Sequence, residues 1–198
     1  MADVRETVIE ATYACVARYG MAKTTIEDVA KESGVSRATI YRLFDGRDQL
    51  LRETVGWEMN RFFLRLAEAV ADAPDLAGRL EIGLTFAHRA IREHEVLQKV
   101  LITEPDRLLP LLTIEQHRVL DYVHDYLRPL LDEEDRAGRL RPGLDLDETA
   151  EYLARMVLSL IASPGRHDLE NPAEVRELVQ RELLGGIVVG GAAPGVRS

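Results

Sequence analysis

The residues with the clearest chemical potential lie close together near the N-terminus, within residues 23–50. Residues 37–43 predict a short helix whose outward face holds basic, hydroxyl and aromatic groups and no acid: Arg37, Ala38, Thr39, Tyr41 and Arg42. An arginine can donate two hydrogen bonds to guanine, a threonine offers a hydroxyl and a methyl group, and a tyrosine can reach a phosphate. This set of side chains fits the major groove of duplex DNA.

Two short helices are expected to position these side chains. Thr24 is placed to cap the first helix, and Glu27, three residues later, completes a capping box. Gly34 ends that helix, because glycine tolerates the left-handed conformation. Ser36 can cap the second helix through its hydroxyl. Two short helices joined by a turn that contains glycine form the helix-turn-helix geometry of DNA-binding proteins.

Further DNA contacts are expected beside the outward face, at Lys23, Thr24, Thr25, Ser36 and Arg47. Arg47 opens the long helix that follows the motif. A cation is unfavourable there in isolation, because a helix N-terminus carries partial positive charge. A phosphate beside Arg47 would reverse that sign, so the pattern favours a DNA contact. For Arg5, a phosphate contact and solvated surface both remain open.

The net charge of −9 has to be divided along the chain before it is interpreted. Of 25 Lys and Arg and 34 Asp and Glu, residues 1–52 hold eight of each, which leaves 17 and 26 for the remainder. The excess acid therefore lies outside the motif. DNA binding requires a local basic surface and not a basic protein.

The composition is that of a globular chain, with 46% hydrophobic and 30% charged residues among 198. No apolar run approaches the ~20 residues that span a bilayer, and the charged N-terminus does not resemble a secretory signal. The one cysteine, Cys15, excludes an internal disulfide and a multi-cysteine zinc site, and a buried position on a helix is expected for it. A cytoplasmic protein without a cofactor is expected.

Helical periodicity continues beyond the motif, and no strand-like alternation interrupts it. Long helices are expected at about 3–19, 47–70, 76–93, 113–134, 149–163 and 173–188. The predicted fold is all-α with about nine helices, in which a three-helix DNA-binding domain precedes a larger helical domain. The expected boundaries are 1–47 for the first domain, 48–190 for the second and 191–198 for a mobile tail.

The motif resembles the DNA-binding segment of one family. From Thr24 to Leu50 the chain follows the pattern T-T-x-x-x-V-A-x-x-S-G-V-S-x-x-T-I-Y-R-x-F-x-x-R-x-x-L, which is similar to that of the TetR transcriptional regulators. The resemblance covers Val4 to Leu51 in residue detail and the rest of the chain in layout. Leu43 stands where the family commonly has histidine, and Arg47 where lysine is commoner, so a polar DNA contact is not expected at Leu43.

The resemblance implies a homodimer with a small-molecule cavity in the larger domain. Candidates for the cavity are aromatic and histidine residues: Trp57, Phe62, Phe86, His88, His117, Tyr122, His124 and Tyr126. Ordinary surface or core positions are the alternative for the histidines, whose spacing does not favour a metal site. Candidates for a four-helix dimer interface come from the last two long helices: Leu153, Met156, Val157, Leu160, Val175, Leu178, Val179 and Leu183.

The function that follows is a dimeric, sequence-specific transcriptional repressor that a small, largely apolar effector releases from an inverted-repeat operator. A helical interaction protein, which keeps the motif for packing without binding DNA, is the first alternative. A small helical enzyme is the second, and it lacks support, because the cysteine is expected to be buried and no serine lies in a G-x-S-x-G turn. Neither a membrane partner nor a metal is expected.

Overall fold

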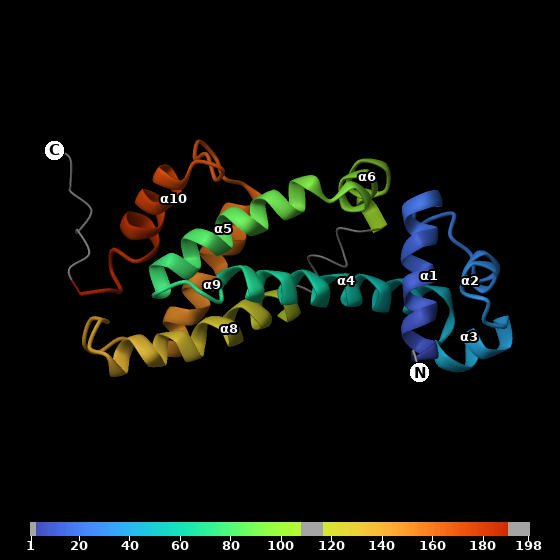
Figure 1. Ribbon diagram of the computed structural model, residues 1–198, viewed down its shortest axis with the longest axis horizontal. Helices are drawn as coiled ribbons and strands as arrows, with labels where there is room; N and C mark the ends of the chain where they lie inside the picture. The colour runs from blue at the N-terminus through green and yellow to red at the C-terminus, as the bar shows by residue number, and fades with distance from the viewer. Residues whose placement is uncertain (1–2, 108–116, 190–198) are drawn as a thin grey trace. The chain divides into compact units, whose positions relative to one another are not determined.

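The structure is a computed structural model that describes residues 3–107 and 117–189, without the side chains of residues 117 and 118 (Figure 1). Its described helices are α1 (Val4–Tyr19), α2 (Ile26–Ser33), α3 (Arg37–Leu43), α4 (Gly46–Val70), α5 (Leu76–Glu93), α6 (Glu95–Thr103), α8 (His117–Arg136), α9 (Leu146–Ala162), α10 (Pro172–Leu178) and a π-helical turn η1 (Val179–Leu183). The described residues form no strand, only one isolated bridge between Leu140 and Val188. The all-α prediction is confirmed.

The chain divides into two compact units. The first comprises Met1–Arg65 and Glu93–Glu115, and so it contains α1 to α3, most of α4, and α6. Its core is built where these helices meet, around the fully buried Val8, Ile40 and Leu50. A second apolar cluster, which includes Val16 and Val100, packs α6 against α1 and α4. The helix-turn-helix and α6 therefore share one packed unit.

The second unit comprises Leu66–Arg92 and Gln116–Ser198. Its core joins the leucine-rich faces of α5, α8, α9, α10 and η1, and it includes Leu84, Leu131 and Leu153, each at most 1% exposed. None of the described helices combines the length and the apolar character that crossing a bilayer requires.

The last helix differs from its prediction. A single helix over 173–188 was expected, whereas α10 ends at Leu178, η1 ends at Leu183, and turns follow. The glycines at 185 and 186 explain the early end, because glycine is a poor helix former. The start of the expected helix 113–134 and the tail 191–198 lie outside the described residues. The boundary of the DNA-binding domain at residue 47 stays a prediction.

Candidate nucleic-acid interface

Helix α2 begins one residue later than predicted. Thr25 is its N-cap, and its hydroxyl accepts a hydrogen bond from the Asp28 N–H at 3.1 Å. The Asp28 carboxylate accepts in return from the Thr25 N–H at 3.0 Å, which completes the capping box. The prediction of a box from Thr24 and Glu27 was wrong. Both threonines are followed three residues later by an acid, and the two registers are indistinguishable by that rule.

Thr24 is correspondingly not part of the surface. Its side chain is 1% exposed, and its hydroxyl donates to the Gly20 carbonyl at 2.7 Å. The side chain therefore cannot reach a phosphate in this conformation. Lys23 and Thr25, on either side of it, are exposed.

The turn and the second helix of the motif agree with their predictions. Gly34 adopts the left-handed conformation with φ +69°, which ends α2. Ser36 caps α3, because its hydroxyl accepts from the Thr39 N–H at 3.2 Å. The same hydroxyl lies 3.0 Å from that of Thr39. Ile40 is fully buried and Phe44 is 2% exposed, so α3 is anchored through its inward face.

The outward face of α3 is exposed to solvent. Arg37, Ala38, Tyr41 and Arg42 are exposed, and Thr39 is half-buried. Arg37 and Tyr41 lie one turn apart, as do Ala38 and Arg42, so the four side chains form one continuous surface. Neither arginine forms an ion pair with any residue that the structure describes. Two guanidinium groups are thus available to an external anion.

Arg47 is not available in the same way. Its guanidinium donates to the Thr24 carbonyl at 2.7 Å, to the Ala22 carbonyl at 3.1 Å and also to the Met21 carbonyl. It lies 3.1 Å from the Asp48 carboxylate as well. The expectation of a phosphate partner is corrected: carbonyl oxygens of the α1–α2 loop compensate this cation at the start of α4.

The α1–α2 loop is held from α6 too. Lys99 donates to the Ala17 carbonyl, at the end of α1, at 2.8 Å, and the Glu104 carboxylate accepts from the Ala22 N–H at 2.6 Å. These contacts join residues 82 positions apart in the chain. Sequence reasoning missed them, because no local pattern indicates which distant side chain meets a loop. The loop that carries Lys23 is consequently fixed by both α4 and α6.

The residues predicted to line an effector cavity are divided between the two units. Trp57 and Phe62 belong to the first unit. The Trp57 ring packs 5.9 Å from that of Tyr13, and the Arg61 guanidinium lies 4.5 Å above it. The remaining candidates belong to the second unit: Phe86, His88, His117, Tyr122, His124 and Tyr126. They therefore do not form one cavity within either unit.

Among the predicted histidines, His124 takes part in a polar network between α8 and α9. Its Nδ1 lies 3.1 Å from Asp125 and its Nε2 lies 3.7 Å from Asp147. Arg128 also donates to Asp147, at 2.8 Å. This network ties the two helices together. The side chain of His117 lies outside the described residues, and no cluster of potential metal ligands occurs in the described part of the chain.

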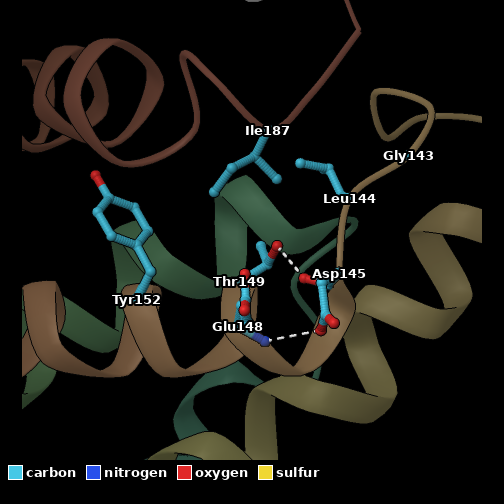
Figure 2. A pocket seen from close by; sticks show the side chains of 7 residues that line it. All are labelled: Gly143, Leu144, Asp145, Glu148, Thr149, Tyr152 and Ile187. Atoms are coloured by element: carbon cyan, nitrogen blue, oxygen red, sulfur yellow. Dashed lines mark hydrogen bonds between the residues drawn. The ribbon is translucent and has the colours of Figure 1, made fainter.

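A surface pocket of about 310 Å³ lies at the start of α9 (Figure 2). It contains none of the predicted effector residues and is lined by Gly143, Leu144, Asp145, Glu148, Thr149, Tyr152 and Ile187. Asp145 is already engaged, because its carboxylate accepts from two N–H groups of the first turn of α9. The Tyr152 hydroxyl donates to the Glu182 carbonyl at 3.2 Å. The polar groups of this pocket thus serve mainly to cap and connect helices.

Five of the eight predicted dimer residues are buried inside the protomer. Leu153, Val175, Leu178, Val179 and Leu183 are each at most 3% exposed, so they belong to the core of the second unit and not to an interface. Met156, Val157 and Leu160 are half-buried and pack at its edge. Cys15 is 1% exposed, as predicted, and burial raises the pKa of its thiol.

Comparison with known proteins gives a consistent result. The sequence model of a family described as bacterial regulatory proteins, tetR family, matches residues 8–54. An uncharacterised HTH-type transcriptional regulator of Mycobacterium tuberculosis is 25% identical over 154 residues, which are 78% of this chain and 72% of the relative.

Two solved structures are similar in fold. One is the TetR family repressor AlkX from a Dietzia strain, implicated in biodegradation of n-alkanes, with a TM-score of 0.62 and 22% identity over 90% of this chain and 94% of AlkX. The other is SmeT in complex with triclosan, with a TM-score of 0.60 and 22% identity over 98% of this chain and 96% of SmeT. SmeT is the repressor of a multidrug efflux pump of Stenotrophomonas maltophilia.

Proposed function

Because the chain belongs to the TetR family of bacterial transcriptional regulators, we propose that it is a homodimeric repressor that leaves an inverted-repeat operator when a small, largely apolar molecule binds. Members of this family bind DNA and regulate transcription, and they are not enzymes. The enzyme hypothesis is therefore set aside.

One observation carries the proposal, namely the different use of the basic side chains in the motif. The Arg47 guanidinium donates hydrogen bonds to backbone carbonyl groups. Arg37 and Arg42, by contrast, have no ion pair within the described residues and extend from one exposed face. Lys23 is also exposed, with no ion pair in the same part of the chain. We assign base contacts in the major groove to Arg37 and Arg42, with Ala38 and Thr39 beside them.

Phosphate contacts are assigned to the remaining exposed groups: Lys23, Thr25, Tyr41 and the N-terminal end of α3 at Ser36. A helix N-terminus presents N–H groups and partial positive charge to an anion. Such contacts orient the protein on the duplex without reading its sequence. Thr24 and Arg47 act behind this surface, by fixing the loop that carries Lys23 and Thr25.

The regulatory part of the proposal rests on symmetry and on chemistry. A dimer places two recognition helices in successive major grooves, about 34 Å apart. A ligand that prefers a different separation of the helices would shift the population away from the DNA-binding form. The complex of SmeT with triclosan and the implication of AlkX in biodegradation of n-alkanes support an apolar effector. We expect the protein to act in the cytoplasm, where it has access to chromosomal DNA.

The test is selection of bound duplexes from a random pool, followed by titration of the selected duplex at several salt concentrations. We expect an inverted repeat, with an affinity that falls with salt at a slope of about −0.9 per neutralised phosphate. Arg42→Ala should relax the preference at one base and weaken the free energy of DNA binding by about 1–3 kcal/mol. Arg136→Ala, outside the motif, is the control and should change neither the base preference nor the affinity. Absence of any enriched sequence, with weak salt-independent binding, would instead favour the packing-module alternative.

A further inference from the structure

Helix α3 cannot set its own orientation. It has seven residues, which is less than two full turns, and isolated helices of this length are unstable in water. At its start it is capped by Ser36, and its inward face is buried at Ile40 and Phe44. The direction in which its outward face points is therefore set by contacts with other helices, including those at its C-terminal end.

Arg5, near the start of α1, holds that end. Its Nη1 donates to the Leu43 carbonyl at 2.9 Å. This carbonyl belongs to the last turn of α3, where carbonyl groups lack partners within the helix and a cation is favourable. The guanidinium carbon also lies 4.5 Å from the centre of the Phe44 ring. One side chain thus satisfies the end of α3 and covers the aromatic ring that follows it.

Glu53, on α4, completes the arrangement. Its carboxylate pairs with Nη2 of Arg5 and accepts from the Gln49 amide at 3.1 Å. Gln49 in turn accepts from the Asp45 N–H, in the turn between α3 and α4. A continuous path of polar contacts therefore runs from α1 through Arg5 to α3, and from Arg5 through Glu53 to α4.

We propose that Arg5 and Glu53 form a brace that sets the angle at which α3 enters the major groove. Both are positioning residues, and Arg5 neutralises no phosphate. The inference rests on the proposed DNA-binding function. Only an arginine can serve, because its planar fork reaches the Leu43 carbonyl and the Glu53 carboxylate together while stacking on Phe44, whereas lysine offers a single point charge.

When the Glu53 carboxylate is removed, the brace and simple electrostatics predict opposite changes in the affinity for DNA. A carboxylate close to DNA repels phosphate, so its removal should strengthen binding. If Glu53 holds α3 in place, Glu53→Ala should weaken binding instead. Glu32 provides a matched control, because it pairs with Arg18 of the same helix α1 at 2.9 Å but belongs to α2.

The experiment measures the affinity of the full-length protein and its variants for the selected duplex across a range of salt concentrations. We expect Glu53→Ala and Arg5→Lys to bind about tenfold more weakly than the parent, with an unchanged salt slope. Glu32→Ala should bind as tightly as the parent or more tightly. The brace is overturned if Glu53→Ala binds as tightly as Glu32→Ala, or if Arg5→Ala lowers the salt slope by about 0.9, as loss of a phosphate contact would.

Amide hydrogen exchange without DNA provides an independent readout. Residues 37–44 should exchange faster in Glu53→Ala and Arg5→Lys than in the parent and Glu32→Ala, under conditions where urea unfolding shows every protein to be folded. Equal exchange in all four proteins would refute the brace. This measurement decides the inference even if the parent selects no duplex, an outcome that would count against the proposed function itself.

Discussion

At the scale of single residues, the same residue type has different roles in one small unit. Arg37 and Arg42 are exposed with no ion pair in the described chain, whereas Arg5 and Arg47 donate to backbone carbonyls. The difference arises because an exposed guanidinium is well solvated, while a guanidinium beside unpaired carbonyls replaces that water with fixed acceptors. Arg47 is the clearer internal case, since it contacts Met21, Ala22 and Thr24.

The Arg47 contacts lead to a prediction about stability. Arg47→Ala should lower the free energy of unfolding by about 1.5–3 kcal/mol, because it leaves the loop carbonyls without their charged donor. Urea unfolding followed by circular dichroism measures this. Arg52→Ala, an exposed arginine less than two turns along the same helix, is the control and should change the free energy by no more than about 0.5 kcal/mol. Equal effects of the two substitutions would contradict the internal role of Arg47.

At the scale of elements, a shift of one residue at the start of α2 exchanges the roles of two threonines. Thr25 caps the helix and is exposed, and Thr24 is buried against the Gly20 carbonyl. The hydrogen bonds that Asp28 accepts, first from the Thr25 hydroxyl and then from its N–H, hold the pKa of the Asp28 carboxyl below its usual 3.8. The capping box therefore stabilises α2 most when Asp28 is ionised.

This dependence gives a prediction with a definite sign. Thr25→Ala should cost about 1 kcal/mol at neutral pH, the usual value of an N-cap. A depressed carboxyl pKa contributes stability that is present above the unfolded pKa and is lost as the pH falls through the folded one. The difference between parent and variant should shrink below pH 3.8. Unfolding curves at neutral and acid pH measure it.

A matched threonine controls for the substitution itself. Thr103 lies in the last turn of α6, where its hydroxyl donates to the Lys99 carbonyl. Thr103→Ala should change the stability by less than about 0.5 kcal/mol at either pH. A difference between parent and Thr25→Ala that stayed constant down to strongly acid pH would mean that the Asp28 carboxylate does not contribute through the box.

For the molecule as a whole, the proposed homodimer would require an apolar surface that the protomer does not already bury. Most of the residues predicted for the interface lie in the core of the second unit, and Leu153 and Leu183 are among them. Met156, Val157 and Leu160, on α9, remain half-buried at its edge. If the proposed homodimer forms through this unit, we expect its interface to include these three residues.

Introducing a charge there should separate the protomers. Leu160→Glu should be monomeric in sedimentation experiments and should bind the operator about 10²-fold more weakly, because two linked half-sites no longer cooperate. Val189→Glu, at a side chain that is 61% exposed outside α8 and α9, should stay dimeric. A dimeric, folded Leu160→Glu variant would exclude this surface as the interface.

The candidate site was predicted unevenly from the sequence, for a physical reason. The end of α2 at Gly34 and the cap of α3 at Ser36 were predicted correctly, because capping depends on residues a few positions apart. The hydrogen-bond partners of Arg47 were not predicted, because the carbonyl groups that accept from it lie 23 to 26 residues away in the chain. The partners of Arg5 were missed for the same reason, since Leu43 and Glu53 lie 38 and 48 residues further along the chain.

Local sequence patterns were enough to predict the all-α class, the helix-turn-helix and the exposed face of α3, since local hydrogen bonding and the spacing of apolar residues carry that information. The tertiary structure was needed to show that Arg5 and Arg47 donate to backbone carbonyls and to show which apolar helix faces are core. A leucine in the core and a leucine at the edge of the core look alike in a sequence, as the buried Leu153 and the half-buried Leu160 illustrate. Their difference depends on which helices pack together, and contacts between distant segments set that packing.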